Sequence, residues 1–393
     1  MEVMMKSFFN VSHMAAGFTA VLVGYTSSVV IIIQAATASG ATPDQIESWL
    51  LALGIAMGLT SIGYSWFYKT PILTAWSTPG AAMLVGAASQ YEMAEVIGAF
   101  GISGLLILLT GLITPLSKAL ERIPPQLGTA MLGAILLPFC LKGFETVTST
   151  PLIFLGMFAT YLMAKHFLPR YTMLVLLLAG ILFAAFSGSS ANSTAFQTAN
   201  VSIAMPVWSS PEFDFSAMLN LAIPLYLITM ISQNLPGIAM MKSYDYKTPI
   251  KPILVGTGLT NILFAPFGGL SVNLAAISAA ICMTPEVDAN KNQRYRAVLW
   301  AGGFYLIAGV FATSVVAVFL SLPQQITAIL AGFALLGTLL MCLQTAFKEE
   351  GYKESALLTF LITLSGISFM GISATLWGLL VGLLHLRITK VSR

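Results

Sequence analysis

The amino-acid sequence predicts an all-α polytopic membrane protein with fourteen transmembrane segments in two inverted seven-helix repeats. Three observations predict this fold class: a strongly apolar composition, a one-sided distribution of basic residues, and two apolar segments interrupted at corresponding places. Of the 393 residues, 57% are hydrophobic and 8% are charged, and the mean hydropathy is +0.87. Soluble domains carry about 25% charged residues, so this composition excludes a soluble protein.

The polar residues argue against several functional classes. The net charge of +3 is spread between the apolar segments without a basic stripe, so no nucleic-acid partner is expected. The three cysteines match neither a disulfide framework nor a zinc site, and the sequence has no phosphate-binding loop with a Walker lysine. We therefore expect no metal, no cofactor and no direct use of ATP.

The apolar segments divide the chain into two sets of seven, since a membrane span needs about 20 mostly apolar residues. The first repeat (residues 1–187) is expected to cross the membrane at 14–37, 47–68, 71–89, 93–114, 126–142, 150–167 and 171–187. The second repeat (216–393) is expected to cross at 216–241, 250–265, 266–283, 295–320, 323–346, 353–369 and 371–388. A Ser/Thr/Asn-rich extracytoplasmic linker, 188–215, joins the two repeats.

The basic residues provide an independent test of this division. If the N-terminus is cytoplasmic, all but one of the eighteen Lys and Arg residues lie on the cytoplasmic side of the membrane. The exception is Lys142, which lies on the extracytoplasmic side. This asymmetry follows the positive-inside rule, so both termini are expected on the cytoplasmic side. The membrane itself is expected to be a bacterial inner membrane. Because seven is odd, the second repeat must start from the opposite side, which makes the repeats inverted.

Segments three and ten are both interrupted by residues that begin helices. When 71–82 and 266–277 are aligned from their first prolines, Thr78 falls on Asn273, and both residue types are good N-caps. Pro79 then takes the favoured first position of a helix. Each segment is therefore predicted to contain an extended stretch followed by a half-helix that begins near the middle of the membrane.

The extended stretches are predicted at 73–77 and 268–272. Unpaired backbone groups are too costly in lipid, so the two stretches are expected to form a short antiparallel pair. The N-termini of both half-helices then face one cavity, where free N–H groups and positive partial charge suit a small anion. Interrupted helices at matching places in two halves indicate a transporter site.

Four stretches of the sequence carry a resemblance to a known family: 24–28 (GYTSS), 73–80 (LTAWSTPG), 232–237 (SQNLPG) and 266–281 (PFGGLSVNLAAISAAI). The chain resembles the benzoate:proton symporter (BenE) family over essentially its whole length. The resemblance implies the fold of uracil permease-type, sulfate-permease and bicarbonate transporters. It also implies a core domain (14–114 and 216–320), a gate domain (115–187 and 321–393), and import of benzoate or a similar aromatic carboxylate with protons.

The related nucleobase carriers usually place acidic residues in segments eight and ten, and this chain does not. Segment eight has Gln233 and Asn234 at the matching place, and segment ten has Ser271, Val272 and Asn273. The missing carboxylates fit an anionic substrate but leave the proton carrier open. At least one of the two amides is expected to face the substrate, although polar residues in membranes also serve to join helices.

The other candidate substrate-binding residues lie in segments one, three and ten. Thr78 and Asn273 are expected to cap their helices, with the N–H groups beyond each cap binding the carboxylate, and Ser77 and Ser271 offer further hydroxyl donors. Trp76 is expected either to form a wall of the cavity that contacts an aromatic ring of the substrate, or to pack between the core and gate domains. Tyr25 and Ser28 belong to a polar cluster that either lines the cavity or bonds back to its own helix.

The leading hypothesis is a secondary active importer that works by alternating access, with the core moving against the gate and the proton as coupling ion. The proton enters either on the substrate or along a water chain; the residues do not decide between these routes. Alternatives are a carrier of another small organic anion or nucleobase-like solute, an anion channel, or a membrane-embedded enzyme. An enzyme is not expected, since no span holds a constellation of acids and histidines. Relatives are often homodimers.

Overall fold

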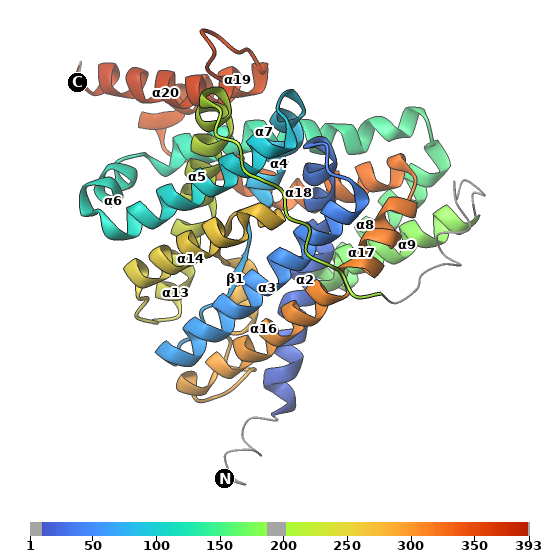
Figure 1. Cartoon of the computed structure of the whole chain (residues 1–393). Helices are drawn as coiled ribbons and strands as arrows, with labels where there is room; N and C mark the ends of the chain where they lie inside the picture. The colour runs from blue at the N-terminus through green and yellow to red at the C-terminus, as the bar shows by residue number, and fades with distance from the viewer. Residues whose placement is uncertain (1–9, 187–201, 392–393) are drawn as a thin grey trace.

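The computed structural model describes residues 10–186 and 202–391, which form helices around one short two-stranded sheet (Figure 1). Among the described residues, eight unbroken helices are long and apolar enough to cross a membrane. One further crossing is formed by two helices that meet at a 63° bend. The chain is therefore a multi-pass membrane protein, while the total of fourteen segments stays a prediction.

The same order of elements occurs in both halves of the chain. The first half contains α2 (Val11–Ala38), α3 (Pro43–Tyr68), β1 (Thr74–Trp76), α4 (Thr78–Ala87), α5 (Met93–Leu112), α6 (Thr114–Glu121), α7 (Pro125–Glu145), α8 (Pro151–Phe167) and α9 (Thr172–Phe186). The second half contains α11 (Phe215–Ala217), α12 (Ile223–Thr229), α13 (Leu235–Ser243), α14 (Ile250–Phe264), β2 (Val272–Leu274), α15 (Ile277–Ile281), α16 (Tyr295–Val310), α17 (Ala312–Ser321), α18 (Gln324–Ala346), α19 (Lys353–Ser365) and α20 (Ala374–Val391). This recurrence agrees with the predicted pair of repeats.

Helices of one repeat pack against helices of the other in a reciprocal pattern. Helix α3 lies along α16, and α5 lies along α14 in the corresponding way (Figure 1). Glycines allow both pairs to approach closely: a Cβ on Gly54 would lie 2.6 Å from the Cα of Gly309, and one on Gly258 would lie 2.4 Å from the backbone nitrogen of Leu108. In each pair, one helix comes from the first half and the other from the second half, in corresponding positions. This crossed packing is expected of an inverted repeat.

The predicted antiparallel pair of strands is present, but only one strand lies where the sequence placed it. β1 falls within the predicted 73–77, whereas β2 begins at Val272, the last residue of the predicted 268–272. The preceding helix continues as a 3₁₀ turn over Ala265–Phe267, and Gly268 ends this turn with a φ of +81°. A Cβ on Gly268 would lie 1.6 Å from Trp49 Cδ1, so only glycine fits here, and the strand starts four residues later than predicted.

Both predicted helix caps are wrong. The N-cap of α4 is Ser77, whose Oγ accepts the Gly80 N–H at 3.1 Å, and Thr78 is the first helical residue. Asn273 lies in β2 opposite Ala75 and caps no helix. Helix α15 begins four residues after Asn273, without a side-chain cap. The alignment of 71–82 with 266–277 did not predict the second cap, because a 3₁₀ turn occupies the first residues of segment ten and the strand begins later.

The outer backbone groups of the two strands are bound by side chains of neighbouring helices. Ser61 on α3 accepts the Thr74 N–H at 3.0 Å. On α14, the Asn261 amide accepts the Val272 N–H at 2.7 Å and donates to the Val272 oxygen at 3.1 Å. Asn234 Oδ1 accepts the Leu274 N–H at 3.0 Å. These contacts give partners to three outward N–H groups and one outward carbonyl of the strands, at a depth where lipid would offer none.

Three features of the helices were not predicted from the sequence. Helix α6 follows α5 directly, in a stretch expected to be a connection. Segment eight contains two π-helical turns, at Met218–Ala222 and Met230–Asn234. Segment eleven, expected as one span over 295–320, bends by 63° between α16 and α17. Hydrophobic spacing alone predicts neither π-helical turns nor bends within a segment.

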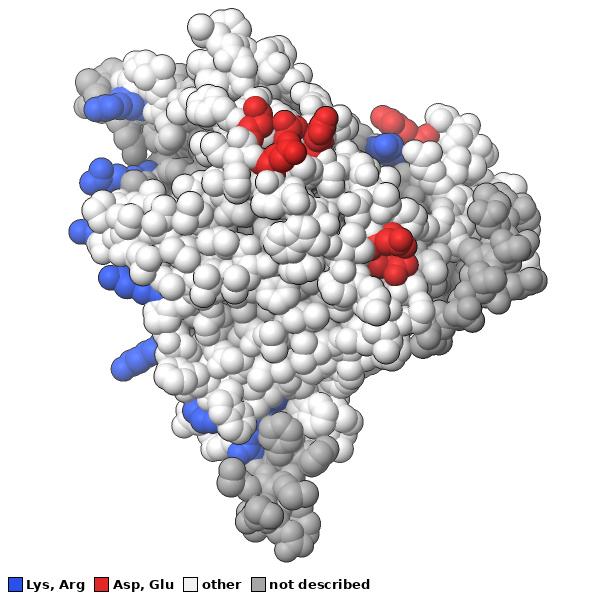
Figure 2. Space-filling model, viewed as in Figure 1, with Lys and Arg blue, Asp and Glu red and all other residues white. Residues whose placement is uncertain are grey.

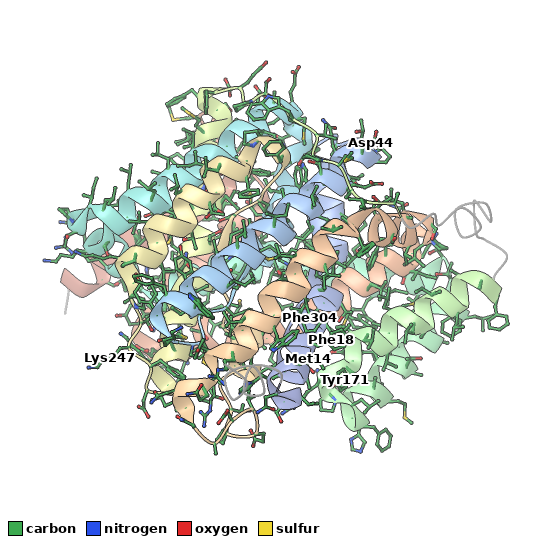
Figure 3. The ribbon with its side chains drawn as sticks, turned by 60° about the horizontal axis from the view of Figure 1, so that its bottom comes forward. Met14, Phe18, Asp44, Tyr171, Lys247 and Phe304 are labelled. Atoms are coloured by element: carbon green, nitrogen blue, oxygen red, sulfur yellow. The ribbon has the colours of Figure 1, made fainter. Side chains whose placement is uncertain are left out.

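Charged residues lie at different edges of the molecule. In Figure 2, most of the visible Lys and Arg follow the left and lower edge, and Asp and Glu lie in the upper and right part. Asp44 and Lys247, expected on opposite sides of the membrane, lie at opposite ends of the molecule in Figure 3. The same view shows Phe18 of α2 against Phe304 of α16, with ring centroids 5.3 Å apart. The orientation in the membrane stays a prediction.

The amide of Asn261 provides a test of strand anchoring. Replacing it in Asn261→Leu leaves a buried N–H and a buried carbonyl of Val272 without partners. We expect the free energy of unfolding in detergent to fall by about 2 kcal/mol or more. Thr257→Val is the matched control, because the Thr257 hydroxyl bonds mainly within its own helix, to the Ile253 oxygen. Equal losses in the two variants would contradict the anchoring role.

Candidate functional site

A cavity of about 290 Å³ lies where the strands give way to α4 and α15. We call it the strand cavity. Its walls come from α2, both strand-to-helix junctions, the second π-helical turn with α13, α16 and α18. It is lined by Val23, Gly24, Ser27, Ser28, Ala75, Trp76, Thr78, Pro79, Ser232, Gln233, Pro236, Met240, Ala275, Ala276, Ile277, Ser278, Tyr305, Ala334, Leu335, Thr338 and Met341. The two half-helices therefore contribute to a single cavity.

Backbone N–H groups at both junctions are free to bind a ligand. At the start of α4, the Ser77 and Gly80 N–H groups are already used, by the Ser271 oxygen and by Ser77 Oγ. Among the described residues, no acceptor is found for the N–H groups of Thr78, Ala276, Ile277 and Ser278. Because α15 has only five residues, its macrodipole is small, and the N–H groups themselves are the main attraction for an anion.

The polar side chains of the strand cavity are uncharged. The Gln233 amide and the Thr78 hydroxyl make no hydrogen bond to any other described residue. Thr338 adds a hydroxyl from α18. None of the lining residues is Asp, Glu, His, Lys or Arg. Such a cavity offers hydrogen-bond donors to an anion without a carboxylate that would repel it.

Trp76 forms a fixed aromatic wall of the cavity. Its indole N–H donates to Ser28 Oγ at 2.7 Å, and Ser28 donates in turn to the Gly24 oxygen at 2.8 Å. The Tyr25 ring supports it from behind, with centroids 4.8 Å apart and planes tilted by 58°. This arrangement holds the indole in one orientation, with part of its surface facing the cavity.

The nine sequence-predicted site residues fall into two groups. Ser28, Trp76, Thr78 and Gln233 line the strand cavity. The others lie behind its wall, where they hold the strands and helices in place; they are Tyr25, Ser77, Asn234, Ser271 and Asn273.

The second group has structural contacts that explain its position. Ser77 caps α4 and accepts the Thr229 hydroxyl at 3.0 Å, while Asn234 binds the edge of β2. The Ser271 oxygen accepts the Ser77 N–H at 2.9 Å, and the Asn273 amide donates to that same oxygen at 3.4 Å. Gln233 and Asn234 are adjacent in the π-helical turn, yet one faces the cavity and the other the strand.

Sequence reasoning missed several lining residues. Ser278 follows the second junction, Tyr305 lies in α16, and Thr338 and Met341 lie in α18. Thr338 is a polar residue within a mainly apolar helix, which was the one available signal. The others carry no motif, because their place in the wall depends on how the helices pack.

Comparison with known proteins identifies the family. The sequence model of the benzoate membrane transport protein family (BenE) matches residues 7–388. The chain belongs to this family. It is 37% identical over 380 residues to the benzoate membrane transport protein of Acinetobacter baylyi (strain ATCC 33305 / BD413 / ADP1), covering 97% of this chain and 95% of the relative. It is 40% identical over 368 residues to the inner membrane protein YdcO of Escherichia coli (strain K12), covering 93% of each.

Solved structures share the fold at low sequence identity. The transmembrane domain of a cyanobacterial bicarbonate transporter, BicA, aligns with a TM-score of 0.59 and 15% identity over 95% of this chain and 97% of that one. The murine anion transporter Slc26a9, in its inward-facing state, aligns with a TM-score of 0.64 and 12% identity over 98% of this chain and 68% of that one. This BenE-family protein is thus a membrane transporter with their fold, and not an enzyme.

Two adjacent serines allow the support of Trp76 to be measured. Ser28→Ala removes the acceptor of the indole N–H, whereas Ser27→Ala removes only a bond to the Gly24 oxygen of its own helix. We expect Ser28→Ala to lower the free energy of unfolding in detergent by about 1–2 kcal/mol more than Ser27→Ala. No difference between the variants would mean that the Trp76 hydrogen bond does not stabilise the wall.

Proposed function

We propose that this protein is a secondary active transporter that imports benzoate or a similar small aromatic carboxylate, together with protons, across the bacterial inner membrane. One observation carries the proposal: Gln233 and the residues at two half-helix junctions whose N–H groups have no acceptor line one uncharged cavity, which Trp76 borders. Membership of the BenE family and the name of the Acinetobacter baylyi relative support the substrate.

The proposed binding mode follows the chemistry of the wall. The carboxylate oxygens accept hydrogen bonds from the free N–H groups of Thr78 and of 276–278, and from the Gln233 amide. The aromatic ring lies against Trp76 and the apolar side chains of Leu335 and Met341. A nucleobase would gain less from this cavity, because its own N–H donors find few acceptors among these groups.

We propose that the membrane domain divides into the core (14–114 and 216–320) and the gate (115–187 and 321–393), and that they move against each other. The strand cavity lies between them, because α18 belongs to the gate and the other lining elements to the core. Elsewhere, the Asn220 amide of the core donates to the Gly371 oxygen at 2.9 Å and accepts the Ser373 N–H at 2.7 Å, both in the gate. Such contacts must break when the core moves.

The proposed orientation in the membrane rests on the one-sided basic residues, which favour cytoplasmic termini. The strand cavity reaches along α13 to Met240 and along α18 to Met341, near the ends of helices predicted to be cytoplasmic. No carboxylate or imidazole lines it among the described residues, so we propose none of its side chains as an acid or base that carries the proton.

Uptake into proteoliposomes tests the proposed function. Purified protein should accumulate labelled benzoate, and an inwardly directed proton gradient should increase the initial rate several-fold. Protein-free liposomes are the control for diffusion of the neutral acid through lipid. Protein-dependent flux that ignores the gradient would contradict proton symport, and the absence of such flux would contradict the substrate.

Gln233 tests the binding mode. Gln233→Ala removes a donor to the charged carboxylate, and hydrogen bonds to charged groups contribute about 1.5–3 kcal/mol. We therefore expect the Kd for benzoate to rise at least about tenfold, measured by calorimetric titration in detergent. Gln344→Ala is the matched control, because Gln344 is exposed near the end of α18 and does not line the cavity. An unchanged Kd in Gln233→Ala would overturn this binding mode.

A further inference from the structure

Tyr305 of α16 brings a phenol hydroxyl to the wall of the strand cavity. The residue is 2% exposed, and its ring belongs to the hydrophobic core. Its Oη makes no hydrogen bond to any other described residue, yet the atom keeps accessible surface. The Tyr25 hydroxyl, by contrast, is fully buried without a partner. The small exposed part of Tyr305 therefore includes its hydroxyl, where the side chain borders the cavity.

Close backbone packing fixes the position of this hydroxyl. Helix α16 lies against both α3 and α2 (Figure 1). A Cβ on Gly54 of α3 would lie 2.6 Å from the Gly309 Cα and 2.8 Å from the backbone oxygen of Tyr305, so α16 has no room to shift toward α3. The Oη atom lies on the axis of the buried ring, and rotation of the ring about that axis leaves the oxygen where it is. The hydroxyl therefore has no other partner within its reach.

Gly24 of α2 keeps the space beside the Tyr305 hydroxyl open. A Cβ at Gly24 would lie 3.6 Å from Tyr305 Oη and 4.0 Å from Ser278 Cβ. All three residues line the strand cavity, so Tyr305 and Ser278 border the same part of it. The Ser278 hydroxyl also makes no hydrogen bond to another described residue and keeps accessible surface. Two accessible hydroxyls thus lie beside the space that the glycine leaves empty.

An unpaired phenol hydroxyl among apolar groups is costly unless water or a ligand accepts its proton. A carboxylate is well suited to this place, because its two oxygens only accept hydrogen bonds and its charge makes those bonds about twice as strong as neutral ones. No lining residue of the strand cavity is Asp or Glu, so no side chain carboxylate competes for the hydroxyl. The hydroxyls are therefore available to a carboxylate that enters the cavity.

We infer that Tyr305 is a substrate-binding residue whose hydroxyl donates a hydrogen bond to the substrate carboxylate, with the Ser278 hydroxyl beside it. The inference rests on the proposed function and adds a side-chain donor from α16 to the Gln233 amide. It also gives Gly24 a role, because a carboxylate oxygen occupies the space that a larger residue would fill. The hydroxyl of Tyr305 then serves the ligand alone, since it has no partner within the described protein.

Two tyrosine variants separate binding from stability. Tyr305→Phe removes a hydroxyl without a protein partner, so the Tm of the ligand-free protein in detergent should not fall, while the Kd for benzoate should rise about tenfold. Tyr226→Phe is the matched control, because the buried Tyr226 hydroxyl bonds to Thr110 Oγ1 at 2.6 Å and does not line the strand cavity. This variant should lower the Tm and leave the Kd unchanged.

Two outcomes of this comparison would overturn the inference. One is an unchanged Kd in Tyr305→Phe. The other is a fall in Tm as large as that of Tyr226→Phe, which would show that the Tyr305 hydroxyl stabilises the protein itself. A second readout comes from the same samples: at a fixed benzoate concentration, the rise in Tm that the ligand gives should be smaller in Tyr305→Phe than in the unmodified protein.

Gly24 provides a test that leaves the hydroxyl in place. The added methyl group of Gly24→Ala makes ordinary van der Waals contacts, and alanine favours a helix, so the Tm should not fall. The methyl group takes the space of the carboxylate oxygen, so the Kd for benzoate should rise at least about tenfold. Gly63→Ala is the matched control, since a Cβ on Gly63 of α3 meets no atom within 4 Å and Gly63 does not line the cavity.

The same titrations distinguish a failure of this inference from a failure of the proposed function. If the unmodified protein binds benzoate and neither Tyr305→Phe nor Gly24→Ala changes the Kd, the role of Tyr305 is excluded and the proposed function stands. If the unmodified protein neither binds nor transports benzoate, the proposed function fails, and the assignment of Tyr305 fails with it.

Discussion

The hydrogen bonding of six strand residues is the constraint on which the rest of the structure depends. β1 and β2 lie within a membrane-spanning fold, where lipid offers no partner to a backbone N–H or carbonyl. The strands pair with each other, and Ser61, Asn261 and Asn234 bind the outward N–H groups of Thr74, Val272 and Leu274. Because the strands are paired, α4 and α15, which follow them, begin beside each other. The first N–H groups of these two helices, which have no partner within the helix, therefore lie near each other at the junctions.

Much of the fold followed from the sequence because its signals are long and repeated. Apolar segments, positive residues on one side and two proline-broken segments predicted the repeats and the pairing of the strands. The position of β2 could not be predicted in the same way. Gly268 looks like the start of an extended stretch, yet it ends a 3₁₀ turn that Trp49, more than 200 residues earlier, packs against. That contact is invisible in the local sequence.

The candidate site was predicted in outline and not in detail. Trp76 and Gln233 line the cavity, whereas Asn234 binds the edge of β2 and Asn273 lies in β2 itself. A polar residue at membrane depth can bind a substrate or satisfy a backbone group, and residue type alone does not separate the two. Thr338 was overlooked because α18 carries no motif, although it closes the cavity from the side of the proposed gate.

The reciprocal pairing of the halves has a consequence for biosynthesis. Thr74 pairs with Leu274, so the first strand waits for a partner that is synthesised 200 residues later. At ordinary translation rates of about 5–20 residues per second, that delay is roughly 10–40 s. Throughout it, segment three has no complete set of hydrogen bonds in the bilayer. The nascent chain must therefore be held at the insertion machinery, or in a provisional helix, until the second half arrives.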